Sequence, residues 1–162
     1  MTWRSAFFAQ ARADWRLFCE LKQRTDVPMC QKLHYLQMAT EKLAKAFSSS
    51  QTGQRPPRSH VALTRFLKVS KGRPEIRHRL GYQENYRSFC AYIDSLLGIA
   101  QQIEQLAPVG DQEGPNAEYP WLDPDSGEVV SPVEYAFPEF SRQELLEFQH
   151  FTNALFRILP HM

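Results

Sequence analysis

The stretch KLHYLQMATEKLAKAF, residues 32–47, decides the fold of this chain. It is dense in alanine, leucine and lysine, which are strong helix formers. Proline is favoured near the first position of a helix, so Pro28, which precedes this stretch, indicates where the helix begins. The stretch therefore predicts an amphipathic helix that ends near residue 47. Its buried stripe recurs every three or four residues, at Leu33, Leu36, Thr40, Leu43 and Phe47.

The same periodicity predicts further helices on both sides of this one. A helix is expected over residues 3–24, and another opens at Ser59, a favourable N-cap, and ends at Gly72. A short extra turn follows over residues 73–80, and the longest helix over residues 83–107. The last helix is expected over residues 141–159, because Ser141 and Glu144 have the spacing of a capping box.

Between the last two helices the composition changes to proline, glycine and acidic residues with isolated aromatics. The turn-forming stretch DPDSG, residues 123–127, separates two short β-prone runs and predicts a small hairpin. We therefore expect one all-α domain, an antiparallel four- to five-helix bundle with a small β-hairpin insertion before the last helix. Its parts are the core helices of residues 3–107, the hairpin segment of residues 108–140 and the C-terminal helix of residues 141–159.

The 162 residues, 43% of them hydrophobic, suffice for a packed core without stabilising disulfide bonds or structural metal ions. Three cysteines, Cys19, Cys30 and Cys90, form an odd set without paired spacing, which favours reduced thiols. No apolar run approaches the roughly 20 residues of a membrane-spanning helix. These features predict a soluble cytoplasmic protein without membrane association.

The net charge of +1 conceals an uneven distribution. Residues 1–90 carry 17 Lys/Arg and 6 Asp/Glu, whereas residues 91–162 carry 2 and 12. Such asymmetry indicates a basic face for phosphate or an acidic partner. The alternative is that the two halves offset each other through surface ion pairs. The basic residues concentrate in residues 55–87, where Arg65 lies on the expected third helix.

The helix of residues 32–47, followed after a polar loop by the helix start SHVAL at residues 59–63, resembles the HEPN superfamily of small helical bundles. The resemblance covers about residues 8–107. It implies a homodimeric module associated with RNA, nucleotides or a nucleotidyltransferase partner. Members of the superfamily include ribonuclease toxins as well as catalytically inert binding modules.

Arg55 and His60, four intervening residues apart, match the arginine–histidine pair of ribonuclease members of this superfamily. The resemblance implies that His60 is a general acid/base and that Arg55 or Arg58 is a phosphate clamp. An imidazole at a helix start would stay largely neutral and could accept a proton from a ribose hydroxyl. Pro56 pushes Arg55 away from helical geometry, so the alternative is a non-catalytic His60 that hydrogen-bonds locally.

A second candidate set lies on the helix of residues 32–47. His34, Gln37, Glu41 and Lys45 are three or four residues apart, which places them on one flank, and Lys42 and Lys45 match lysines that recur in HEPN members. The functional interpretation is the polar rim of a binding cleft; the alternative is a solvated flank held by a Glu41–Lys45 pair. The predicted binding residues are thus His34, Gln37, Glu41, Lys42, Lys45 and Arg65.

The sequence predicts no metal and no cofactor. Cys30 and His34 have the spacing of half a zinc site, but no second pair completes it. We find no glycine-rich phosphate loop and no dinucleotide fingerprint. The preferred hypothesis is an accessory binding module. The alternatives are a metal-independent endoribonuclease of the toxin or defence type and a structural protein-interaction module.

Overall fold

The computed structural model describes residues 1–49, 61–107 and 114–159 of the chain. This part is mostly helical, which confirms the all-α expectation. None of the described helices combines the length and hydropathy that are required to cross a membrane. The elements are α1 (Trp3–Leu21), α2 (Met29–Ser48), α3 (Ala62–Ser70), α4 (Pro74–Arg79), α5 (Tyr86–Ser95), α6 (Leu97–Gln105), β1 (Trp121–Leu122), β2 (Val129–Val130) and α7 (Arg142–Ile158).

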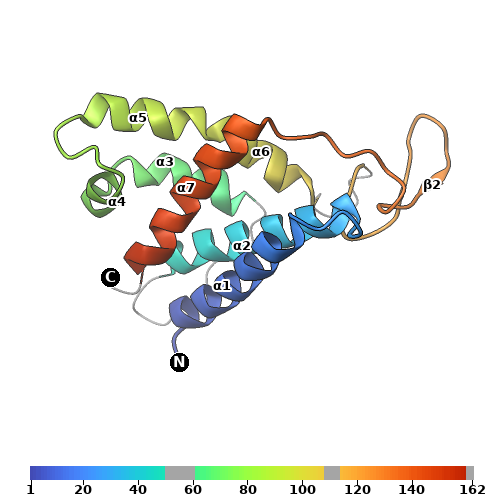
Figure 1. Ribbon diagram of the computed structural model, residues 1–162, viewed down its shortest axis with the longest axis horizontal. Coiled ribbons are helices and arrows are strands. Elements are labelled where there is room, and N and C mark those ends of the chain that lie inside the picture. The colour runs from blue at the N-terminus through green and yellow to red at the C-terminus, as the bar shows by residue number, and fades with distance from the viewer. Residues whose placement is uncertain (50–60, 108–113, 160–162) are drawn as a thin grey trace.

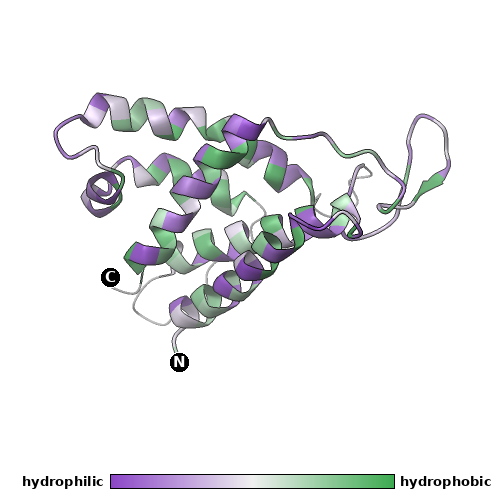
Figure 2. Cartoon of the chain, in the orientation of Figure 1, coloured by the Kyte–Doolittle hydropathy of each residue, from purple (hydrophilic) through white to green (hydrophobic). Residues whose placement is uncertain are grey.

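The helix predicted from residues 32–47 is the central element, α2. It packs along α1 and also contacts α3 and α6, while α7 contacts α4 and α6 (Figure 1). The predicted stripe of α2 is buried, with Leu36 fully inaccessible and Leu43 2% exposed. Figure 2 shows hydrophobic residues on the inward sides of the helices and hydrophilic ones outward. A helix that is enclosed by three neighbours needs apolar residues around most of its circumference, and α2 has them.

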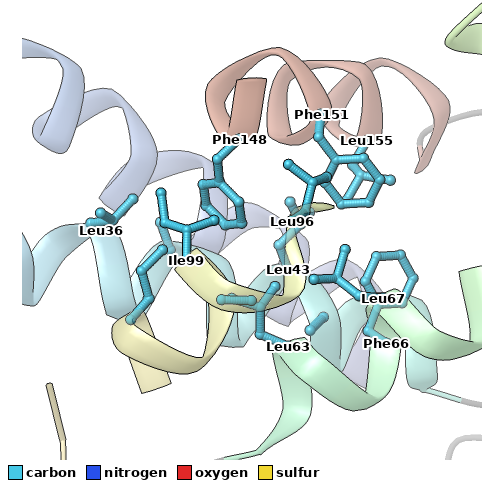
Figure 3. Close-up of a cluster of buried hydrophobic side chains, with 14 of the residues drawn as sticks. Leu36, Leu43, Leu63, Phe66, Leu67, Leu96, Ile99, Phe148, Phe151 and Leu155 are labelled. Carbon is cyan, nitrogen blue, oxygen red and sulfur yellow. The ribbon is translucent and has the colours of Figure 1, made fainter. Parts of the chain in front are cut away.

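One buried cluster joins the helices. Phe66 of α3 lies between Phe47 of α2 and Phe151 of α7, with ring centroids 4.9 and 6.4 Å away. Tilted aromatic contacts of this kind add to the stabilisation by burial alone. Figure 3 shows how side chains from α2, α3, α6 and α7 meet in this cluster, among them Leu36, Leu43, Leu63, Phe66, Leu67, Ile99, Phe148, Phe151 and Leu155.

The helix expected over residues 83–107 is divided into α5 and α6. The division falls at Leu96, whose amide donates to the carbonyl of Ile93 instead of continuing the regular ladder. The Ser95 hydroxyl donates to the Tyr92 carbonyl at 2.7 Å, and Gly98 follows directly. Serine back-bonding and a nearby glycine are established causes of helix bending.

The third helix also begins later than predicted. It starts at Ala62 with Val61 as its N-cap, and Val61 makes no side-chain capping bond. The predicted start at Ser59 is therefore wrong, and Ser59 itself lies outside the described residues. By contrast, the capping box of Ser141 and Glu144 at the start of α7 is present as predicted.

The predicted hairpin is confirmed. β1 and β2 pair antiparallel, with Trp121 opposite Val130. The turn is held by the Asp123 carboxylate, which accepts from the amides of Asp125 at 2.8 Å and Ser126 at 3.4 Å. Gly127 has a φ of 71°, a left-handed conformation that favours glycine.

A series of aromatic contacts connects the hairpin to the core. The Trp121 ring lies edge-on to Tyr135 at 5.0 Å, and Tyr135 lies edge-on to Phe137 at 4.9 Å. Phe137 is buried and belongs to the main core cluster. The hairpin itself projects from the end of the molecule that lies opposite α4 (Figure 1).

Candidate functional site

Three of the predicted binding residues form a polar row along α2. Gln37 Nε2 donates to Glu41 Oε2 at 2.7 Å, and Lys45 forms an ion pair with Glu41 Oε1 one turn further on. The Lys45 and Glu41 side chains are each 15% exposed, and Gln37 is 3% exposed. The expected Glu41–Lys45 pair is thus present, but it lies largely inside the protein rather than on a solvated flank.

Lys42 takes part in a different interaction, with α1. Its Nζ lies 2.6 Å from Asp14 Oδ2, and Gln10 Nε2 donates to Asp14 Oδ1 at 3.0 Å. Asp14 is 7% exposed, so its charge needs these partners. A cavity of about 160 Å³ adjoins the pair and is lined by Gln10 and Lys42 together with Trp3, Ala6 and Phe7.

Asp14 and Gln10 were not recognised from the sequence, although a signal was available. Asp14 lies three residues after Ala11 and four before Phe18, which places a carboxylate on the apolar stripe of α1. A charge at such a position predicts a buried partner, and Lys42 is that partner. Lys42 and Lys45 therefore serve different neighbours despite their proximity in sequence.

The remaining predicted binding residues stand apart from both networks. His34 is half-buried near the start of α2, and its ring lies edge-on to Tyr35 at 5.2 Å. Arg65 is exposed on α3 and forms no ion pair with another described residue. The structure thus brings Gln37, Glu41 and Lys45 together and joins neither His34 nor Arg65 to them.

The three catalytic candidates, Arg55, Arg58 and His60, lie outside the described residues. Their role therefore stays a prediction. His60 precedes the N-cap of α3 instead of lying in its first turn, since the helix begins at Ala62.

The N-terminus of α3 is occupied by a carboxylate of the chain itself. Glu104 of α6 accepts with Oε1 from the amides of Leu63 at 2.8 Å and Thr64 at 3.0 Å. Its Oε2 accepts from the Thr64 hydroxyl at 2.8 Å. Helix N-termini are common phosphate sites because their amides lack intrahelical acceptors. Here Glu104 already accepts from two of these amides, those of Leu63 and Thr64, and places a negative charge where an anion would otherwise bind.

Basic side chains gather on α3, α4 and the start of α5. Two of them are paired within the protein, Lys71 with Asp94 at 2.6 Å and Arg73 with Glu75 at 3.4 Å. Five others form no ion pair with a described residue, and we call them the basic end. They are Arg65, Lys68, Arg77, Arg79 and Arg87.

Arg77 connects α4 to α5 within the basic end. Its guanidinium carbon lies 5.7 Å from the ring centroid of Tyr86, an interaction between a cation and an aromatic face. Its Nε is buried without a hydrogen-bond partner among the described residues. The Tyr86 side chain is 53% exposed, and its hydrogen bond with Cys90 raises the pKa of its hydroxyl above the usual value of 10.0.

Acidic side chains occupy the opposite end of the molecule. Residues 114–140 contain no lysine or arginine, and their hairpin lies at the far end of the longest axis from α4 (Figure 1). Among ion pairs between described residues, Lys71–Asp94 alone joins the basic half of the sequence to the acidic half. The alternative interpretation, that the two halves compensate each other through ion pairs, is thus limited to this one pair among the described residues.

The described residues contain no group of three or more His, Cys, Asp and Glu side chains that is arranged to hold a metal ion. The three cysteines are free thiols, and Cys30 is buried. Comparisons with protein-family models, curated proteins and solved structures give no match for this chain.

Proposed function

We propose that this chain is a HEPN-like accessory module that binds RNA or a nucleotide through its basic end. In this proposal the module is a homodimer and acts beside a nucleotidyltransferase-type partner. The observation that carries the binding function is the set of five basic side chains on α3, α4 and the start of α5 that lack ion pairs among the described residues. Their free charge is available to phosphate groups.

The chemistry of the basic end suits a single-stranded polyanion. Four of its five members are arginines, whose guanidinium groups bind phosphate through two parallel hydrogen bonds. Tyr86 offers an exposed ring beside Arg77, and bases stack on such rings without sequence preference. Five phosphate contacts would give a slope of about −3.5 for the logarithm of the binding constant against the logarithm of salt concentration.

Anisotropy of a fluorescent single-stranded RNA tests the proposal. The variant Arg79→Glu/Arg87→Glu should weaken binding by about ten-fold or more, because it reverses two phosphate contacts. The matched control is Arg12→Glu/Arg16→Glu, which makes the same charge change on exposed positions of α1. Equal losses in the two variants, or binding that does not respond to salt, would refute the proposal.

The alternative function is a metal-independent endoribonuclease with His60 as general acid/base and Arg55 or Arg58 as phosphate clamp. The observation that favours it is the position of exposed Arg65 on the helix that follows these residues directly in sequence. Such an enzyme should cut single-stranded RNA in chelator, and His60→Ala should abolish cleavage while the helical circular dichroism stays unchanged. Identical behaviour of wild type and variant would eliminate cleavage by His60 and leave the binding proposal standing.

Affinity capture distinguishes a purely structural interaction module from the RNA-binding module that we propose. Its protein partner should be recovered equally with and without nuclease treatment. A partner that is lost on nuclease treatment would instead support an RNA-bridged association through the basic end.

A further inference from the structure

A cavity of about 200 Å³ lies where the end of α1, the start of α2 and the start of α7 meet. Its floor consists of Phe18, Leu33 and Leu36, which belong to the main core. Its walls are Leu145 of α7 and Phe140, which belongs to the segment before α7. The cavity therefore opens a path from solvent to the apolar interior.

The segment of residues 138–140, which we call the strap, has a cavity on each side. The second cavity, of about 360 Å³, lies between the strap and α6, and Pro138 and Phe140 border both. Protein interiors are normally filled to the density of organic crystals, so side chains with space on both sides forgo dispersion contacts. Phe140 is half-buried in this position. A ligand under the strap would supply the missing contacts.

Two lysines line the smaller cavity. Lys22 Nζ donates to Gln149 Oε1 at 3.0 Å, and Lys32 Nζ donates to the Arg24 carbonyl at 2.5 Å. Neither forms an ion pair with a described residue. An ammonium group has three donors, so each keeps two for a ligand. Glu139 is the one carboxylate of the lining, against two lysines. Asp26, a further carboxylate that interacts electrostatically with Lys32, is itself paired with Arg24.

We propose that this cavity binds a small amphipathic carboxylate, with its apolar body on Phe18, Leu33 and Leu36 and its carboxylate at Lys22 and Lys32. An apolar cavity of about 150 Å³ accommodates benzene, so the present volume accepts one aromatic ring and a short chain. Ligand sites typically combine a mostly apolar lining with a few polar groups, and the lining of this cavity combines apolar side chains with two lysines. The site is independent of the RNA-binding proposal.

The test compares two probes of the same shape on the full-length protein. 3-Phenylpropionate carries the carboxylate, and 3-phenylpropan-1-ol replaces it with a hydroxyl. In amide-resolved NMR titrations, the acid should shift the resonances of Leu33 and Leu145 and bind at least about five-fold more tightly than the alcohol, the contribution of charge-assisted hydrogen bonds. Lys22→Gln/Lys32→Gln should reduce the affinity for the acid to that for the alcohol and leave the alcohol unchanged.

A control with Arg12→Gln/Arg16→Gln removes the same charge from exposed positions of α1 and should leave both affinities unchanged. If the lysine variant does not fold, the difference in affinity between the acid and the alcohol on the wild-type protein still tests the proposal. Equal affinities for the two probes, shifts confined to Gln105 and Leu106 beside the larger cavity, or no shifts at all would overturn the proposal.

Discussion

Replacement of Glu104 by alanine should destabilise the protein far more than a substitution on the surface of α6 normally does. The carboxylate accepts three hydrogen bonds, two from the amides of Leu63 and Thr64 and one from the Thr64 hydroxyl. Loss of an N-cap acceptor costs about 1 kcal/mol, and a hydrogen bond to a charged group contributes about 1.5–3 kcal/mol. Water can replace part of this loss because the site is half-buried, so we expect about 2–3 kcal/mol for Glu104→Ala.

Glu104→Gln separates the hydrogen bonds from the charge. Both amides donate to the same oxygen, Oε1, which a glutamine oxygen can replace. The glutamine amide group then faces the Thr64 hydroxyl, which can rotate and accept. The remaining loss is the favourable interaction of a negative charge with the N-terminus of α3, about 0.5–1 kcal/mol.

Urea unfolding followed by circular dichroism measures these free energies. Gln101→Ala is the control, because Gln101 is exposed on the same helix and makes no hydrogen bond with a described side chain. The expected order of destabilisation is Glu104→Ala, then Glu104→Gln, then Gln101→Ala. A value for Glu104→Ala within about 0.5 kcal/mol of the control, the range of ordinary surface substitutions, would refute the capping role. Equal losses for Ala and Gln would show that charge, not hydrogen bonding, accounts for the effect.

Three further substitutions test other parts of the fold. Lys42→Met should lower the free energy of unfolding in urea by about 3 kcal/mol, because it leaves the buried Asp14 carboxylate without its ion pair. The double variant Asp14→Leu/Lys42→Met should recover at least half of that loss, because it removes the buried charge as well. Burial raises the pKa of Tyr92 above the usual 10.0, so its contribution to stability is full below pH 10 and is lost as the pH rises further. Tyr92→Phe should flatten this alkaline dependence of the unfolding free energy; an unchanged slope would contradict the assignment. Gly127→Ala should strain the hairpin by about 1 kcal/mol at its φ of 71° and alter Trp121 fluorescence, while the helical unfolding midpoint stays constant.

The features that the sequence predicted correctly are those that short segments determine. The helix around residues 32–47 follows from a period that recurs within every turn, and its Glu41–Lys45 pair follows from a spacing of four residues. The capping box at Ser141 requires a partner only three residues away. In each case the interacting groups are fixed relative to one another as soon as the local backbone forms.

The features that were missed depend on groups that are distant in the chain. Glu104 caps a helix 40 residues before it, and Asp14 meets Lys42 across 28 residues. Local periodicity carries no information about which carboxylate reaches which donor. The division at Leu96 was missed for another reason, since the apolar stripe continues through it and hides the effect of the Ser95 hydroxyl.

The arrangement of charge makes the two proposed sites separable. With a net charge of +1, the protein as a whole has almost no attraction for a polyanion, so any strong binding of RNA must come from a local surface. Charges are screened beyond about 8 Å at physiological ionic strength, which is far less than the length of a bundle built on a 20-residue helix. The basic end lies on α3, α4 and the start of α5, whereas the cavity under the strap lies at the junction of α1 and α2, toward the hairpin (Figure 1). A charge reversal at Arg79 and Arg87 therefore cannot reach Lys22 and Lys32 through the solvent, so a variant that loses RNA while retaining 3-phenylpropionate reports on the basic end alone.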